Sequence, residues 1–181
     1  ECLEKGSSLR DVNGIAYLEN GEYVRTPPRE RMTDLDSLPS PLWNKLGDLS
    51  RYFTPLYGRN AVSIVTSRGC PGNCTFCYSK MMWGYKWYAF SPQRVVSEIE
   101  NIMTLDPRIT GFIIMDDLFA TDPKRVEDIC SLIINKKLDI IWNCEIRADM
   151  ITESLLDIMK RAGCKQILVG VESGSDRLLT M

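Results

Sequence analysis

Short apolar runs alternate with amphipathic stretches through the second part of the chain, and this alternation limits the fold more than any other feature. Four of the runs lack the polar–apolar alternation of a half-exposed strand, so they are predicted to be strands buried on both faces. They are residues 61–66, 111–115, 138–142 and 166–171. Strands that alternate with amphipathic helices predict an α/β fold with a parallel sheet and right-handed crossovers. Half a barrel and an open, doubly wound sheet both satisfy this pattern.

Local signals predict where the helices between these strands begin and end. The first is expected to begin after Ser91, because serine is a good N-cap and a proline follows it. Thr121 and Thr152 are the expected caps of the next two helices. Gly163 is expected to end the last of these in a left-handed conformation. Residues 175–181 are expected to open a fourth helix.

Residues 1–60 differ from residues 61–181 because they are polar and rich in loops. Asn20 and Gly21 separate two β-prone segments, and both residue types suit the positive φ angles of a type I′ turn, so a small hairpin is predicted. Closely spaced prolines follow, which fix φ and remove N–H donors. Residues 26–60 are therefore expected to form an irregular linker in front of an α/β domain that starts at residue 61.

The composition excludes several classes of function. The chain is 44% hydrophobic and 25% charged with a net charge of −2, so a core can be buried and no basic surface for nucleic acid is expected. No apolar run reaches the roughly 20 residues that span a bilayer, and no signal-peptide pattern opens the sequence. The chain is therefore expected to be cytoplasmic. The absence of histidine excludes Ser-His-Asp triads, Cys-His dyads and histidine-ligated metals.

Three of the seven cysteines lie together just after the first predicted strand. Cys70, Cys74 and Cys77 have C-x3-C-x2-C spacing on a glycine- and proline-containing loop. Three soft thiolates on one short loop can bind one polynuclear centre. No fourth ligand follows, so one metal position would stay open, as a catalytic metal requires. The alternative is a zinc knuckle or unrelated buried cysteines; Cys130 and Cys144, in apolar stretches, are expected to be core residues.

This cysteine motif, with an aromatic residue before its last cysteine, resembles the signature of the radical S-adenosylmethionine (radical SAM) superfamily. The resemblance implies that Cys70, Cys74 and Cys77 bind a [4Fe–4S] cluster whose open iron chelates the amino and carboxylate groups of SAM. An electron from the cluster would cleave SAM to a 5′-deoxyadenosyl radical, with flavodoxin or ferredoxin as reductant. The family fold has six strands, so the four βα units counted here imply a truncated, partial parallel (β/α) barrel.

Polar residues follow each predicted strand. Because carboxyl ends of parallel strands meet at one rim, where chemistry gathers, a binding site is expected there. The family often has Gly-Gly-Glu after its second strand, where this chain has Met-Asp-Asp, so the resemblance implies that Asp116 or Asp117 accepts the SAM ammonium. It also suggests that Arg147 pairs bidentately with the SAM carboxylate. A surface ion pair with Asp149 is the alternative for this arginine.

Three further residues are linked to SAM by the resemblance. Glu172 and Ser173 lie where family members make polar contacts to SAM, although Ser173 is also a candidate helix N-cap. Phe76 lies where the family uses an aromatic residue beside adenine. Core packing is the alternative for this phenylalanine.

Four segments resemble a particular branch of the family, the radical SAM proteins that follow a cobalamin-binding domain. They are residues 34–39, 91–92, 116–119 and 170–174. The branch implies an Fe–S oxidoreductase or a transferase, with methyl transfer or methylthiolation as its reaction. Its members commonly bind cobalamin through a histidine motif in a preceding domain. Because this chain has no histidine, cobalamin is expected only in the full-length protein.

Two other functions remain open from the residues alone. The first is a non-catalytic iron–sulfur electron carrier, which would normally ligate every iron with protein. The second is a zinc-stabilised binding module. The substrate, whether a small molecule, a peptide or another compound, is not indicated by the sequence.

Overall fold

The computed structural model describes residues 2–179. A small hairpin lies near the start of this part of the chain. The chain divides into two units, Glu1–Thr33 and Asp34–Met181. The first contains α1 (Cys2–Lys5), η1 (Leu9–Asp11), β1 (Ala16–Glu19) and β2 (Glu22–Arg25). The predicted hairpin is confirmed, because β1 pairs antiparallel with β2 across Asn20 and Gly21, whose φ angles are 52° and 84°.

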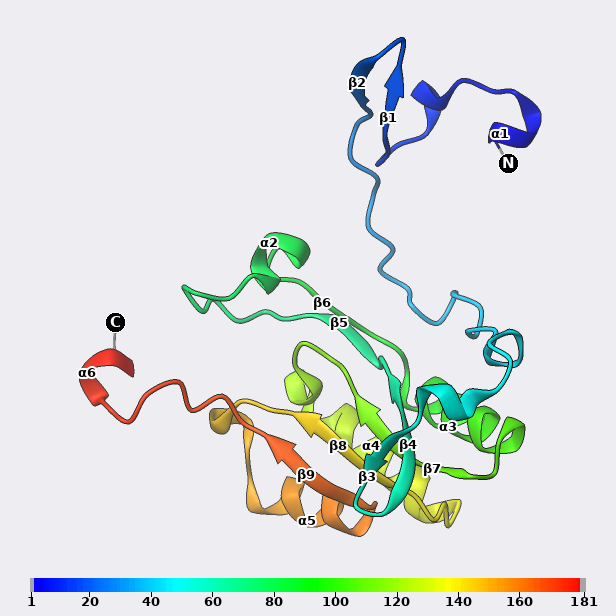
Figure 1. The fold of residues 1–181 in the computed structure, drawn as a ribbon. Helices are drawn as coiled ribbons and strands as arrows, with labels where there is room; N and C mark the ends of the chain where they lie inside the picture. Colours follow the sequence, from blue (N-terminus) through cyan, green and yellow to red (C-terminus); the bar gives the residue numbers. More distant parts are fainter. Residues whose placement is uncertain (1, 180–181) are drawn as a thin grey trace. The chain divides into compact units, whose positions relative to one another are not determined.

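The second unit contains a curled five-stranded sheet of order β3-β4-β7-β8-β9 (Figure 1). Its strands are β3 (Thr54–Leu56), β4 (Arg59–Ile64), β7 (Ile109–Ile114), β8 (Ile141–Glu145) and β9 (Cys164–Leu168). The last four are parallel, which confirms the predicted α/β fold with a partial parallel barrel. β3 pairs antiparallel with β4 and lies in the segment predicted to be an irregular linker, so this part of the prediction is wrong.

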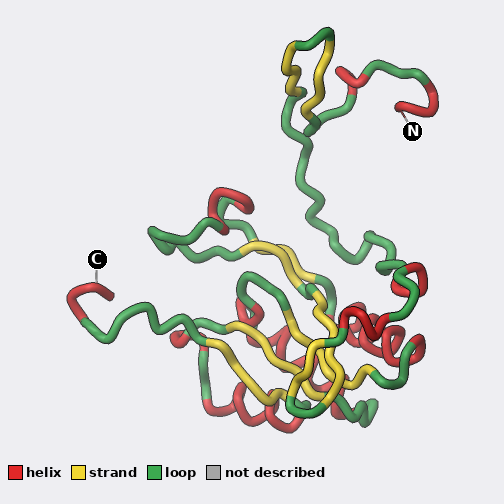
Figure 2. The backbone as a smooth tube through the Cα atoms, viewed as in Figure 1, coloured by secondary structure: helices red, strands yellow, loops and turns green. Residues whose placement is uncertain are grey.

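Three helices pack on one face of this sheet (Figure 2). They are α3 (Pro92–Leu105), α4 (Pro123–Asn135) and α5 (Glu153–Arg161). The predicted caps of α3 and α5 are confirmed, because Ser91 accepts from the amide of Arg94 and Thr152 from that of Leu155. The cap predicted for α4 is wrong: Asp122 accepts from the amide of Arg125. Thr121 instead ends the short turn η4 (Phe119–Thr121) and donates to the Leu118 carbonyl.

The core between the sheet and the helices is built around large buried side chains. The rings of Phe119 and Trp142 meet edge to face with centroids 5.6 Å apart, and the Trp142 indole donates to the Ala162 carbonyl at 2.9 Å. Cys130 and Cys144 are buried in this core, as predicted. Among the described helices, none is long and apolar enough to cross a membrane.

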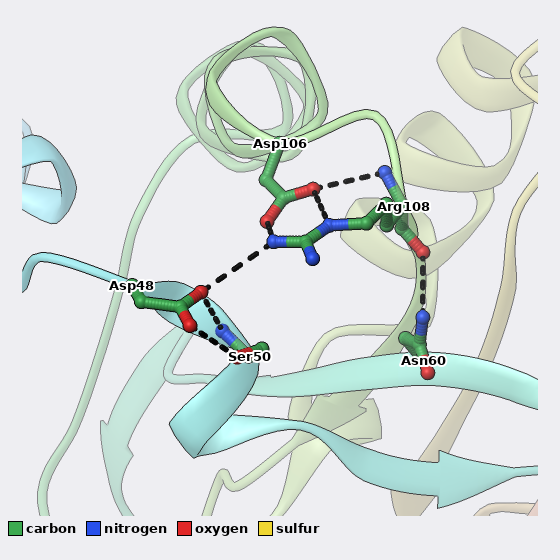
Figure 3. Close-up of polar contacts among 5 residues, drawn as sticks. All are labelled: Asp48, Ser50, Asn60, Asp106 and Arg108. Carbon is green, nitrogen blue, oxygen red and sulfur yellow. Dashed lines mark hydrogen bonds and ion pairs between the residues drawn. The ribbon is translucent and has the colours of Figure 1, made fainter.

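A polar network fastens residues before β3 to the end of the sheet opposite the strands' carboxyl ends (Figure 3). Arg108 donates to the Asp106 carboxylate at 2.9 and 2.7 Å and lies 3.5 Å from an oxygen of Asp48. Asp48 caps η3 (Leu49–Tyr52) by accepting from Ser50. The Asn60 side chain, in β4, donates to the Arg108 carbonyl at 3.3 Å. The segment before the sheet is thereby attached to the turn between α3 and β7.

We expect Asp106→Asn to lower the thermal midpoint at neutral pH, because the Arg108 guanidinium holds the pKa of the Asp106 carboxyl below its ordinary value. A depressed carboxyl pKa contributes stability above the unfolded value of about 3.9, and this stability is lost as the pH falls through the folded pKa. The difference in midpoint between the two proteins should therefore shrink below about pH 4. Thermal melts at several pH values test this; a pH-independent difference would contradict it.

Candidate functional site

The clustered cysteines lie on an excursion from the carboxyl end of β4. Its base is a two-stranded ribbon of β5 (Ser67–Gly69) and β6 (Trp87–Ala89), paired antiparallel. The residues between them, 70–86, are called the cysteine loop here and contain α2 (Ser79–Trp83) (Figure 1). Sequence reasoning missed the ribbon and α2. The topology nevertheless places the cysteines beyond the rim where the parallel strands end.

Two of the three cysteine sulfurs converge near Gly72. A Cβ atom added to Gly72 would lie 3.2 Å from the Cys70 Sγ and 4.0 Å from the Cys74 Sγ. The Gly72 amide donates to the Cys70 Sγ at 3.3 Å, and the Ser79 amide donates to the Cys77 Sγ at 3.4 Å. All three thiols are half-buried and free of disulfides. The missing side chain at Gly72 therefore leaves space beside the sulfurs.

The cysteine loop supplies three thiol donors. Within residues 2–179, no three Cys, Asp or Glu side chains lie close enough together to hold one metal ion. Structural zinc usually takes four protein donors, one more than the three cysteines of the loop. A [4Fe–4S] cluster spans more space between its thiolates, and amide N–H groups that donate to sulfur are a usual part of its surroundings. The donor set on this loop therefore fits such a cluster.

Asp116 and Asp117 have different surroundings, although the sequence could not separate them. Asp116 is 3% exposed. Its oxygens accept four hydrogen bonds, from the amides and hydroxyls of Thr66 and Ser67, at 2.6 to 2.9 Å. Asp117 is exposed and uses one oxygen, which accepts from the Gly69 amide at 2.9 Å. Asp116 therefore anchors the entry to β5, whereas Asp117 presents a carboxylate to the rim beside Cys70.

Arg147 lies at the same rim, after β8. Its Nε and one terminal nitrogen donate to the two oxygens of Asp149 at 3.0 and 2.8 Å, which is the ion pair considered as its alternative role. These bonds hold the pKa of Arg147 above its ordinary value and the pKa of Asp149 below its ordinary value. The other terminal nitrogen is 3.9 Å from the Cys74 Sγ. The structure therefore brings Arg147, Cys70 and Cys74 together around Gly72.

The remaining predicted residues are exposed or half-buried. Phe76 is 70% exposed, so the core-packing alternative is wrong. Glu172 is exposed and has a left-handed backbone, with φ of 61°. Ser173 accepts from the Ser175 amide at 3.0 Å, in the turn before α6 (Asp176–Leu179). For the part of the chain described, no hydrogen bond joins Phe76, Glu172 or Ser173 to the three cysteines.

Comparison with known sequences gives a consistent family. The profile of the radical SAM superfamily matches residues 64–181. An uncharacterised methyltransferase of Pyrococcus horikoshii is 34% identical over 179 residues, which are 99% of this chain and 38% of that protein. The anaerobic magnesium-protoporphyrin IX monomethyl ester cyclase of Rubrivivax gelatinosus is 30% identical over 186 residues, 99% of this chain and 33% of that protein. The chain thus spans less than two fifths of these relatives.

Solved structures share the fold. The cobalamin-dependent radical SAM enzyme OxsB, with aqua-cobalamin and SAM bound, has a TM-score of 0.75 and 26% identity, over 98% of this chain and 26% of its own. The methyltransferase TsrM of Kitasatospora setae has the same TM-score at 18% identity, over 98% of this chain and 35% of its own, and shows the fold alone. With the profile match and the Pyrococcus relative, these findings show that the chain belongs to the radical SAM superfamily, whose enzymes use a [4Fe–4S] cluster and SAM.

Proposed function

We propose that this chain supplies the front part of a radical SAM catalytic domain, in which Cys70, Cys74 and Cys77 bind a [4Fe–4S] cluster. When bound, that cluster supplies an open iron for SAM and the electron that cleaves SAM to a 5′-deoxyadenosyl radical. The observation that supports this most strongly is the convergence of two cysteine sulfurs and Arg147 around Gly72. It lies at the carboxyl ends of parallel strands, where α/β enzymes place their chemistry.

The chain's own groups would stabilise the thiolates. The amides of Gly72 and Ser79 already donate to two of the three sulfurs, and such bonds stabilise negative charge on sulfur. The Arg147 guanidinium, 3.9 Å from the Cys74 Sγ, adds a positive charge at the same place. Iron binds cysteine as the thiolate, and these donors would contact the negative charge of the bound sulfurs.

Asp117 is the carboxylate we propose for the SAM ammonium. Its exposure leaves one oxygen for a ligand, and the Gly69 amide fixes the other oxygen one residue before Cys70. Arg147 is proposed for the SAM carboxylate, since the terminal nitrogen that does not bond to Asp149 lies beside the cysteines, 3.9 Å from the Cys74 Sγ. The exposed ring of Phe76 offers a face to adenine, and Glu172 and Ser173 supply further polar contacts from beyond β9.

Methyl transfer is the reaction class that we propose for the whole protein. The Pyrococcus relative is named a methyltransferase, and OxsB is named a cobalamin-dependent enzyme. Cobalamin would then be held by a part of the protein other than this chain. A flavodoxin or ferredoxin is the proposed reductant. The proposed location of the protein is the cytoplasm.

Anaerobic reconstitution with iron and sulfide tests the cofactor proposal. We expect about four irons and four sulfides per chain and a reduced cluster whose electron paramagnetic resonance (EPR) spectrum changes when SAM is added. The change indicates an iron that is open to SAM, which an electron carrier with four protein ligands lacks. One tightly bound zinc per chain and no cluster would overturn the proposal, as would a cluster that ignores SAM.

We expect Asp117→Asn to keep the cluster and to weaken SAM binding roughly tenfold, because a hydrogen bond to a charged group contributes about 1.5 kcal/mol or more. Asparagine can still accept from the Gly69 amide, so the loop should keep its anchor. Titration of the SAM-induced EPR change measures the affinity. Asp139→Asn is the matched control, since Asp139 is exposed and pairs with Arg59 at the other end of the strands. Equal affinities for both variants would exclude Asp117.

A further inference from the structure

We infer that Arg125 is a positioning residue for the cysteine loop, because its guanidinium binds both the residue that enters and the residue that leaves the β5–β6 ribbon on which the loop stands. Nε donates to the Phe90 carbonyl at 2.8 Å, and one terminal nitrogen donates to the Thr66 carbonyl at 2.7 Å. Thr66 directly precedes β5 and Phe90 directly follows β6. The Phe90 amide also donates to the Thr66 carbonyl at 3.0 Å. The inference rests on the proposed function of the loop.

Arg125 reaches this place from the first turn of α4, which starts at the Asp122 cap. Its side chain is 6% exposed and lies over the ring of Trp87, 5.8 Å from its centroid, and over that of Phe119 at 6.0 Å. One partner ring thus belongs to β6 and the other to the core. A planar guanidinium can stack on rings and donate in its own plane at the same time, which a lysine cannot do.

Burial is the largest influence on the pKa of Arg125 and lowers it, although the carboxylates of Asp116, Asp122 and Asp36 act in the opposite direction. Among the described residues no carboxylate bonds to the guanidinium directly. Its third nitrogen is buried without a partner. Taking a charge out of water is costly, and apolar side chains of similar volume are often at least as stable at such positions. What an apolar side chain cannot do is hold two carbonyl oxygens at a fixed spacing.

Asp116 binds the same residue, Thr66. It accepts from the amide and hydroxyl of Thr66, while Arg125 binds the carbonyl of that residue. Thr66 is therefore fixed through both of its backbone polar groups, by side chains that come from β7's end and from α4. Of these two side chains, it is Arg125 that also binds the exit of the ribbon, at the Phe90 carbonyl. These hydrogen bonds fix the base of the loop and thereby the positions of the sulfurs relative to Asp117 and Arg147. Such positions matter, because a displacement of about 1 Å in a reacting group can lower a rate a hundredfold.

Substitution of Arg125 in the full chain tests this role. Arg125→Gln removes the charge and the fork, and Arg125→Lys keeps the charge without the fork. Lys124→Gln is the matched control, because Lys124 is the neighbouring residue on α4 and pairs with Asp128 on the surface. Without iron, hydrogen exchange in the ribbon and its two flanking residues, 66–69 and 87–90, should rise at least tenfold in Arg125→Gln. Exchange in β7 and β8 should stay as in the wild type.

With the cluster loaded, we expect the half-life against an iron chelator to fall at least tenfold in Arg125→Gln and less in Arg125→Lys, with no change in the control. Wild-type exchange in the ribbon of both Arg125 variants would overturn the inference. A uniform rise in hydrogen exchange across the whole sheet would also overturn it, because such a rise indicates general destabilisation. If Arg125→Gln does not fold, the same comparison is made in Arg125→Lys. If the wild type takes up no cluster, the proposed function fails, and ribbon exchange without iron still decides whether Arg125 fixes the loop.

Discussion

Alanine at Cys70, Cys74 or Cys77 is expected to abolish uptake of a [4Fe–4S] cluster, and each single substitution should suffice. Two thiolates leave half of the four irons without a protein ligand, so the cluster is no longer held against chelators. The fold should persist, because all three cysteines are half-buried in a loop outside the sheet. Iron and sulfide per chain after anaerobic reconstitution measure the loss, and far-ultraviolet circular dichroism checks the fold.

The other cysteines provide controls. Cys2→Ala should leave cluster uptake unchanged, since Cys2 lies outside the C-x3-C-x2-C motif. Cys130 and Cys144 cannot replace a lost ligand, because both are buried in the core between the sheet and the helices. Burial also raises the pKa of Cys130 to about 12, and a hydrogen bond to Cys164 together with burial raises the pKa of Cys144. Retention of about four irons in Cys74→Ala, or their loss in Cys2→Ala, would contradict the assignment.

The parallel sheet could be predicted because apolar runs alternate with amphipathic helices along the sequence, although β9 is only partly buried. The strand boundaries could not be predicted. The third strand was expected at residues 138–142, yet β8 spans Ile141–Glu145. After α4 the chain turns at Lys137, which has φ of 52°, and the Leu138 amide donates back to the Ile133 carbonyl. Leu138, the first apolar residue of the run at 138–142, therefore belongs to the end of the helix and not to the strand. The hydrophobic pattern cannot show it, because leucine suits a helix end as well as a strand.

The cap of α4 was missed although its signal is present. Asp122 stands before Pro123, as Ser91 stands before the proline that opens α3, and both side chains accept from the amide three residues on. Pro123 indicates the N-cap of α4 better than Thr121 does. Proline favours the first helical position and so places the cap one residue before it.

The cysteine motif could be recognised from spacing, but the residues that hold the loop could not. β5 and β6 have three residues each, too few to show a period. The carbonyls that Arg125 binds lie 35 and 59 residues away in sequence, and backbone acceptors leave no trace in the side-chain pattern. Asp116 was predicted to lie at the rim of the sheet. Its burial could not be predicted, because it depends on Thr66 and Ser67, which connect β4 to β5 and donate to its carboxylate.

Gly69→Ala is expected to break the ribbon below the cysteine loop. Gly69 has φ of 87°, where an L residue is strained, and an added Cβ would lie 2.2 Å from the Lys86 carbonyl oxygen and 3.0 Å from the Trp83 Cβ. The closest atom is backbone of the opposing segment, so a side-chain rotation cannot relieve the clash. We expect a local cost of roughly 3 kcal/mol or more, opening of the pairing between β5 and β6, and loss of most of the cluster.

Gly84→Ala separates this clash from the backbone strain. Gly84 also has a left-handed φ, 62°, and caps α2 within the same loop, but an added Cβ meets nothing within 4 Å. Its cost should be the conformational one alone, about 1 kcal/mol, with cluster content near that of the wild type. Hydrogen exchange of residues 67–69 and 87–89, measured with iron content, compares the two. If both alanines reduce cluster content equally, strain in the loop rather than the ribbon's closure decides cluster retention, and the close approach at Gly69 has no special role.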